Sequence, residues 1–178
     1  MPPPAQPPGP VVDDRAIAAH VPRLRRYAAA LAGNLADADD LVQDCIEKAL
    51  ANRHALRDVS RLGGWLLSIL HNLHVSGLRG RRRRGPEVPV DDLADDLALS
   101  AEPADRGEVR DFVRAFGQLS EEHRTVLLLT GLEGLSYREA AEVLEVPIGT
   151  VMSRLARARE RLRVLLDGGE ERVVRRIK

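Results

Sequence analysis

A set of polar and basic residues lies on one face of a predicted helix that begins just after Pro147. The set is Thr150, Ser153, Arg154, Arg157 and Arg161. A guanidinium group can bridge phosphates or hold the O6/N7 edge of guanine, so this face is typical of DNA recognition. The alternative is a solvated basic face, in which Glu160 pairs with Arg157 or Arg163. The helix alone leaves both interpretations open.

The residues before this helix indicate how it is held. Ser136 and Glu139 have the S-x-x-E spacing of a capping box, which predicts a helix from Tyr137 to about Leu144. Pro147 suits the start of the next helix, because a first helical residue needs no amide donor. Two helices joined by so short a turn must cross and touch. This is the layout of a helix-turn-helix, whose second helix enters the DNA major groove.

Apolar residues at helical spacing predict the core of this second half of the chain. On the second helix they are Val151, Leu155, Ala158, Leu162 and Leu165. The pattern Val109, Phe112, Val113 and Phe116 predicts a further helix that covers this core, and Ser120 is the expected cap of a helix through Val126–Leu129.

The residue types argue against catalysis and metal binding. The five histidines show no ligand spacing with Cys45, so we expect no structural zinc, no cofactor and no enzymatic activity. A single cysteine cannot form an internal disulfide, which fits a reducing cytoplasm. Because Cys45 lines up with Leu41 and Ala49, we expect a buried structural thiol. No apolar run approaches the length of a membrane span, so no membrane insertion is expected.

Composition favours helices and divides the charge into blocks. Aromatic residues make up 3% of the 178 residues, whereas leucine, alanine and arginine dominate. The formal net charge is zero. Nevertheless, 57–84 holds seven arginines against Asp58 alone, and 85–105 holds seven acidic residues and no base. Such segregation indicates surfaces with different partners.

The chain therefore reads as an all-α fold of two small helical domains joined by a flexible acidic linker. In the first domain we expect a helix from about Asp13, kinked or started late at Pro22, a second helix over 38–51 capped by Asp37, and a third over 62–82. The predicted divisions are a disordered proline-rich tail (1–12), the first domain (13–84), the acidic linker (85–105), the helix-turn-helix domain (106–167) and a charged tail (168–178).

Three segments, in this order, resemble the extracytoplasmic-function (ECF) sigma factors of the sigma-70 family. The first, 37–44, resembles the segment that docks on RNA polymerase. The second, Trp65-Leu66 with 69–72, resembles the segment that opens the promoter −10 element. The third, 132–141 with 146–151, resembles the domain that reads the −35 element. The sequence around 41–44 and 133–136 also resembles the general-stress branch of this family.

The resemblance implies a role for each surface. The first domain would be sigma region 2 and the second sigma region 4. Core RNA polymerase would be bound through the clamp helices of its largest subunit by Asp40, Gln43, Asp44 and Glu47. The −10 element would be held by Asn72, Arg57, Arg79, Arg81, Arg82, Arg83 and Arg84, and the −35 element by Thr150, Ser153, Arg154, Arg157 and Arg161. The amide of Asn72 would read a base that has left the stack.

The resemblance also implies partners and exposes three departures from the family pattern. Expected partners are core RNA polymerase, promoter DNA and an anti-sigma factor, with a monomer when free. Ser76 stands where an acid is frequent, so a salt bridge there is in doubt. Glu145 replaces the turn glycine, so either a non-glycine residue adopts a strained turn or the turn differs slightly. Met152 stands where a basic side chain is common, which indicates an altered −35 preference or fewer phosphate contacts.

Two alternatives remain at this level. A sigma-like mimic would bind an anti-sigma factor without touching promoters, although known mimics carry a receiver domain, and none fits before Val21. A stand-alone helix-turn-helix regulator would bind a palindromic site as a dimer without polymerase. A further hypothesis concerns the linker: Asp91–Asp96 would lie against Arg79–Arg84 or Arg154–Arg161 and suppress stray DNA binding in the free protein.

Overall fold

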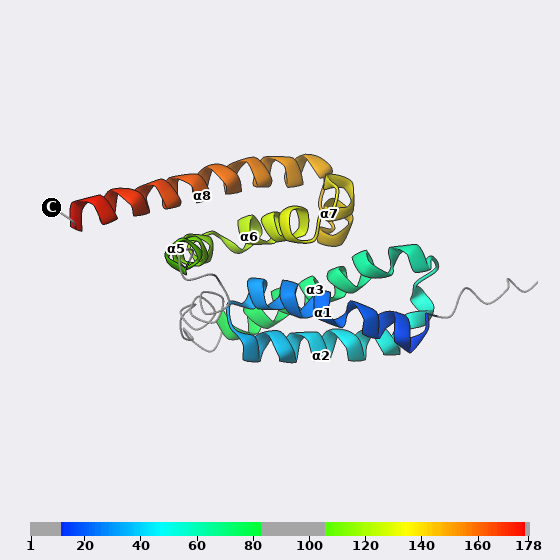
Figure 1. Ribbon diagram of the computed structural model, residues 1–178. Coiled ribbons are helices and arrows are strands. Elements are labelled where there is room, and N and C mark those ends of the chain that lie inside the picture. The colour runs from blue at the N-terminus through cyan, green and yellow to red at the C-terminus, as the bar shows by residue number, and fades with distance from the viewer. Residues whose placement is uncertain (1–11, 83–105, 177–178) are drawn as a thin grey trace, which may run out of the picture.

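The computed structural model describes residues 12–82 and 106–176, and their regular elements are all helical. The helices form two layers (Figure 1). We call residues 12–82 the first module, with α1 (Asp14–Ala32), α2 (Leu35–Ala51) and α3 (Leu62–Arg82). We call residues 106–176 the second module, with α5 (Arg106–Gly117), α6 (Glu121–Leu127), η3 (Leu128–Leu132), α7 (Tyr137–Leu144) and α8 (Ile148–Arg176). The predicted all-α fold is confirmed.

Some predicted features lie outside the described residues. They are the tail up to residue 11, the acidic linker with its contact to the arginines, and Arg83 and Arg84. The predicted division at residue 167 falls within α8, which continues to Arg176.

Local hydrogen bonds explain where the first two helices begin. Asp13 caps α1 by accepting from the Arg15 N–H at 3.2 Å. The helix then runs through Pro22 without a break, so the late start is wrong. Asp37 was also wrongly predicted as the cap of α2. Oδ1 of Asn34 accepts from the Asp37 N–H at 2.8 Å, so the helix starts at Leu35 and Asp37 lies in its first turn.

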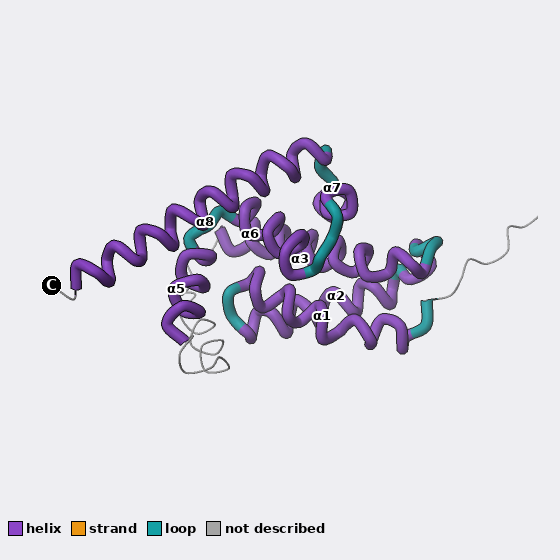
Figure 2. The backbone as a smooth tube through the Cα atoms, turned by 45° about the horizontal axis from the view of Figure 1, so that its top comes forward, coloured by secondary structure: helices purple, strands orange, loops and turns teal. Residues whose placement is uncertain are grey.

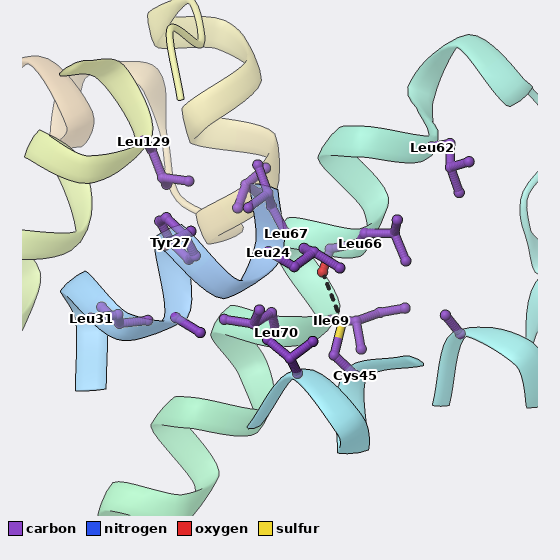
Figure 3. Close-up of a cluster of buried hydrophobic side chains, with 14 of the residues drawn as sticks. Leu24, Tyr27, Leu31, Cys45, Leu62, Leu66, Leu67, Ile69, Leu70 and Leu129 are labelled. Carbon is purple, nitrogen blue, oxygen red and sulfur yellow. Dashed lines mark hydrogen bonds between the residues drawn. The ribbon is translucent and has the colours of Figure 1, made fainter. Parts of the chain in front are cut away.

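The first module packs around the inward faces of its three helices. Its fully buried side chains include Tyr27 and Leu31 of α1 and Leu66 of α3. Cys45 of α2 is also buried, and its Sγ lies 3.4 Å from the carbonyl oxygen of Leu66 (Figure 3). Burial raises the pKa of this thiol to about 12, so the expected structural role of Cys45 is confirmed.

The loop between α2 and α3 holds two short 3₁₀ turns, η1 (Arg53–Ala55) and η2 (Val59–Arg61). In η2, the side chain of Asp58 accepts hydrogen bonds from the Ser60 N–H and hydroxyl. This loop leads directly into α3, which has the predicted bounds.

In the second module, α6 and α8 pack across their apolar faces. Val126 of α6 is fully buried, and of the stripe predicted for α8, Val151, Leu155 and Ala158 are buried. Leu162 and Leu165, predicted in the same stripe, are only half-buried. Phe112 of α5 was expected in this core, but it is 46% exposed and stacks on Phe116 with ring centroids 5.9 Å apart. The buried residues of α5 are Val113 and Ala115, and Phe116 is partly buried against the core, so Phe112 is left at its rim.

The two modules are in contact. In Figure 1 α3 runs beneath α6 and α7, and it contacts α7. The tube in Figure 2 shows the same modules from another side. Leu128 and Leu129 of η3, and Ala140 and Val143 of α7, belong to the same hydrophobic cluster as the core of the first module. No pattern in the sequence indicated this shared core.

Candidate nucleic-acid and polymerase interfaces

The helix-turn-helix is fixed by a complete capping box and an unusual turn. The Glu139 N–H donates to the Ser136 hydroxyl oxygen, and the Ser136 N–H donates to the Glu139 carboxylate at 2.8 Å. Helix α7 ends at Leu144, and the next residue, Glu145, caps it with φ 54° and ψ 40°. This is the left-handed conformation, so the turn is strained at this non-glycine position. The Val146 N–H then donates to the Ala141 carbonyl at 3.1 Å, which closes the turn before α8.

The predicted −35 residues occupy two different environments on α8. Ser153, Arg157 and Arg161 are exposed, and Thr150 is half-buried beside them. Among the side chains that the structure describes, no carboxylate forms an ion pair with Arg157 or Arg161. Glu160 instead pairs with Arg163 at 2.9 Å, one of the two pairings considered. The outer face of α8 therefore offers two uncompensated guanidinium groups.

Arg154 points in another direction. Its side chain is 23% exposed, and Nη2 lies 2.9 Å from the carboxylate of Glu122 in α6. This ion pair ties the guanidinium of Arg154 to α6, whereas no such pair holds Arg157 or Arg161 among the described side chains.

A groove beside the outer arginines brings in residues that the sequence pattern did not single out. Gln118, Ser120 and His123, around the start of α6, line it together with Arg157 and Arg161. The only available signal was the cap at Ser120, which places free N–H groups and the positive end of the α6 dipole near this groove.

The predicted −10 residues are spread along α3 and the loop before it. Asn72 is exposed, and so is Arg57. Arg79, Arg81 and Arg82 lie in the last turns of α3. At Ser76, where the family often has an acid, the hydroxyl donates to the Asn72 carbonyl at 2.8 Å within the same helix.

The acidic face of α2 is open to solvent. Asp40, Gln43, Asp44 and Glu47 are all exposed, and the amide of Gln43 donates to Glu47 at 3.1 Å. These side chains share one face because they recur at helical spacing. The opposite face, with Val42 and Cys45, is buried in the core.

A cleft of about 330 Å³ lies between the modules, with Arg154 as the one predicted site residue in its lining. His71, Val75 and Leu78 of α3 line one side, and Glu121, Glu122, Thr125, Leu144 and Arg154 line the other. His71 neighbours Asn72 in sequence. The cleft therefore places Arg154, one of the predicted −35 residues, across from the helix turn next to Asn72, one of the predicted −10 residues.

Burial and nearby charges tune the groups in this cleft. Nε2 of His74, which is 3% exposed, lies 2.7 Å from Oε1 of Glu121. Burial by itself raises the pKa of Glu121, but the hydrogen bond from His74 and the charge of Arg124 outweigh it and lower the pKa. The pKa of His71 is lowered chiefly by burial.

The described residues show no group of three or more histidine, cysteine or acidic side chains that could hold a metal ion. None of their helices is both long and apolar enough to cross a bilayer.

Comparison with known proteins identifies the class. Residues 110–162 match the family model for sigma-70 region 4, and residues 17–71 match that for the sigma2 domain of PhyR. The chain is 40% identical over 159 residues to the ECF RNA polymerase sigma factor EcfG of Rhodopseudomonas palustris (strain TIE-1), covering 87% of this chain and 86% of that protein. It is 33% identical over 141 residues to the ECF RNA polymerase sigma-E factor of Escherichia coli (strain K12), covering 70% and 71%.

Solved structures agree. The sigma factor RpoE of Bartonella quintana, crystallised with the anti-sigma factor NepR, has a TM-score of 0.70 and 33% identity, and the match covers 86% of this chain and 95% of that one. CnrH, in complex with the cytosolic domain of CnrY, has a TM-score of 0.61 and 28% identity, with 86% of each chain covered.

The chain belongs to the ECF sigma factors, as its sequence indicated. It is an RNA polymerase sigma factor of this type, which directs core polymerase to specific promoters. A stand-alone helix-turn-helix regulator has no need of the sigma2 match in the first module.

Proposed function

We propose that the chain grips one promoter at two separated places, with each module acting as a distinct domain over 13–84 and 106–167. The −35 element is read by the outer face of α8, through Arg157 and Arg161 with Thr150 and Ser153 beside them. The observation that carries this assignment is the exposure of both arginines without an ion pair among the described residues. Arg154 joins the DNA contact once it leaves Glu122.

The −10 element is opened by binding rather than by covalent chemistry, so the chain is no enzyme and needs no cofactor or metal. Asn72 is exposed on α3 and has the donor and acceptor needed to read a base edge. Extruding a base costs a few kcal/mol, which is offset by phosphate contacts from Arg57, Arg79 and Arg81–Arg84.

The acidic face of α2 docks on core RNA polymerase. Its four residues are exposed, and three of them carry carboxyl groups that steer association with a basic partner. Asp39, one residue away, is already paired with Arg25 of α1 at 2.9 Å, so its carboxylate is less available to a partner. Exchanging Asp40 and Asp44 for asparagine weakens polymerase binding, whereas Asp39→Asn leaves it nearly unchanged.

The modules have to separate before both promoter elements are held. Elements named −10 and −35 lie about 25 base pairs apart, which is roughly 85 Å at about 3.4 Å per base pair. In the closed structure, His71 and Arg154 line one cleft. Binding to polymerase in the cytoplasm favours the open form, and an anti-sigma factor of the kind bound to RpoE or CnrH competes with it.

Transcription with purified core polymerase tests this proposal. Promoters are selected with the reconstituted holoenzyme, and start-site choice is then compared between the chain and Asn72→Ala. We expect Asn72→Ala to lose initiation on duplex promoters and to recover most of it on a template with a pre-opened −10 region. Ser76→Ala, one turn along the same exposed face, is the matched control. A chain that neither binds core polymerase nor directs start-site choice would refute the proposal.

A further inference from the structure

Three pairs of side chains join the modules across their shared interface. They are Arg23–Glu133, Arg61–Glu142 and His74–Glu121. Both partners of Arg61–Glu142 are more than half exposed, so this pair contributes little by itself. The other two lie at the core, where water screens them less.

The Arg23–Glu133 pair has the features of a built contact. The side chain of Glu133 is fully buried and that of Arg23 is 30% exposed. Nη2 of Arg23 also lies 3.4 Å from the Glu133 backbone carbonyl. A Cβ on Gly63 would lie 2.7 Å from Nη1 of Arg23, so the glycine leaves room for the guanidinium to reach across.

The buried carboxylate of Glu133 depends on this single arginine. Its Oε1 has no hydrogen-bond partner among the described residues. Tyr27 is fully buried nearby, and its pKa is raised by burial and then by the charges of Glu133 and Glu121. Leu129 points toward the Tyr27 ring at the same junction (Figure 3). A carboxylate buried this deeply destabilises the closed form unless it is paired.

We propose that Arg23 and Glu133 form an autoinhibitory latch that holds the two DNA-reading modules together in the free protein. The inference rests on the proposed function, because the closed form counts as inhibited only if both promoter elements must be held at once. In the closed form the two modules share one core and cannot reach promoter elements that lie roughly 85 Å apart, so polymerase has to bind the open fraction. The apparent affinity for polymerase is then reduced by the fraction of molecules that are open.

The latch is tested in the full-length chain by measuring the distance between the modules. Fluorophores are placed on cysteines introduced at Ala19 and Arg159, which are exposed in the first and second modules. Cys45 is the only native cysteine, and because it is buried it does not compete for the label. Energy transfer between the two labels reports the closed fraction.

Arg23→Ala leaves the Glu133 carboxylate buried without its partner. We expect the ratio of closed to open molecules to fall at least about tenfold, and the dissociation constant for core polymerase to fall with it. Glu133→Gln in the Arg23→Ala background removes the unpaired charge, so the closed fraction recovers. General damage to the fold would not be reversed in this way. Arg25→Ala, which breaks only the exposed pair with Asp39 inside the first module, is the matched control and leaves both readouts unchanged.

The outcomes separate the latch from the proposed function. If Arg23→Ala stays as compact as the native chain, or opens without tighter polymerase binding, the latch is refuted. The same holds if Glu133→Gln fails to restore closure while circular dichroism shows intact helices. If the native chain fails to bind core polymerase at all, the proposed function is refuted instead.

Discussion

The second module carries basic side chains on its outer face and acidic side chains on its inner face, and among the described side chains only the acidic ones are paired across the module interface. On the outer face, Arg157 and Arg161 are exposed and have no ion pair within the described part of the chain. On the inner face, Glu121, Glu133 and Glu142 each meet a basic side chain of the first module. Although the formal net charge is zero, the acidic and basic side chains therefore have different tasks. The acids hold the closed fold together, and the arginines are left for a polyanion.

The largest expected effect comes from breaking the outer face. The double exchange of Arg157 and Arg161 for alanine removes two groups able to form bidentate contacts, each worth about 1–3 kcal/mol against a wrong base. We expect roughly 30-fold or greater loss of the advantage that a −35 element gives in transcription. The salt dependence of binding to −35 DNA should weaken by about two phosphate contacts.

Arg159→Ala is the control for this prediction. Arg159 is exposed on the same helix, but helical geometry places it on the side away from Arg157 and Arg161. A double variant that keeps the full −35 preference, or a control that loses it, would show that α8 reads DNA with a different face.

The inner face is broken most strongly by shortening Leu129. This side chain is fully buried where η3 meets the first module, so Leu129→Ala leaves a cavity and lowers the free energy of unfolding by about 2–5 kcal/mol. Leu132→Ala, in the same π-helical turn but 39% exposed, should cost much less. Chemical denaturation measures both. Equal losses would mean that the shared core adds nothing to stability.

Local features of both faces could be predicted from the sequence. The capping box at Ser136, the cap at Ser120 and the buried apolar stripe of α8 depend on residues within one or two turns of each other. For the same reason, the family motifs were readable. Asp37 was chosen over Asn34 as a cap because both are good caps, and only the backbone geometry decides between them.

The contact between the modules could not be predicted in this way. Arg23 and Glu133 are separated by 110 positions, and no periodicity links them. Arg154 shows the same limit at shorter range. It sits at the edge of the basic face, so a small rotation of the helix decides whether it meets DNA or Glu122. The roles of the predicted site residues stay predictions until DNA or polymerase is bound.

Lowering the pH should reduce the stability of the folded chain in two steps. The pKa of His71 is lowered by burial, with further lowering from His74 and Arg154 and opposition from Glu121 and Glu145. The unfolded chain therefore takes up this proton first, so stability falls as the pH drops below about 6.5 toward the folded pKa. The pKa of Glu121 is also lowered, so its stabilisation is present above about 4.5 and lost below it as the carboxylate is protonated.

Denaturation curves across this pH range measure both steps. His71→Gln should reduce the loss of stability that begins near pH 6.5, to which His20, whose pKa is also lowered by burial, contributes as well. The loss below pH 4.5 should remain. The matched control is His54→Gln, because His54 is exposed in the loop after α2. An unchanged pH profile for His71→Gln would mean that another group governs the first step.

The smallest effect concerns the two positive-φ residues that bracket α7 at the junction of the faces. Gly134 has φ 67° and Glu145 has φ 54°. A residue with a side chain is strained by about 1–2 kcal/mol in this conformation. Glycine is not strained there, but it loses more conformational entropy when the chain folds. Glu145→Gly should therefore stabilise the chain by up to about 1 kcal/mol, and Gly134→Ala should destabilise it by a similar amount. A Cβ on Gly134 would meet nothing within 4 Å, so the stability lost in Gly134→Ala would come from backbone strain alone. Thermal melting of both variants decides the matter: a loss of stability in Glu145→Gly would show that the glutamate side chain, and not the backbone turn, holds α7 against α8.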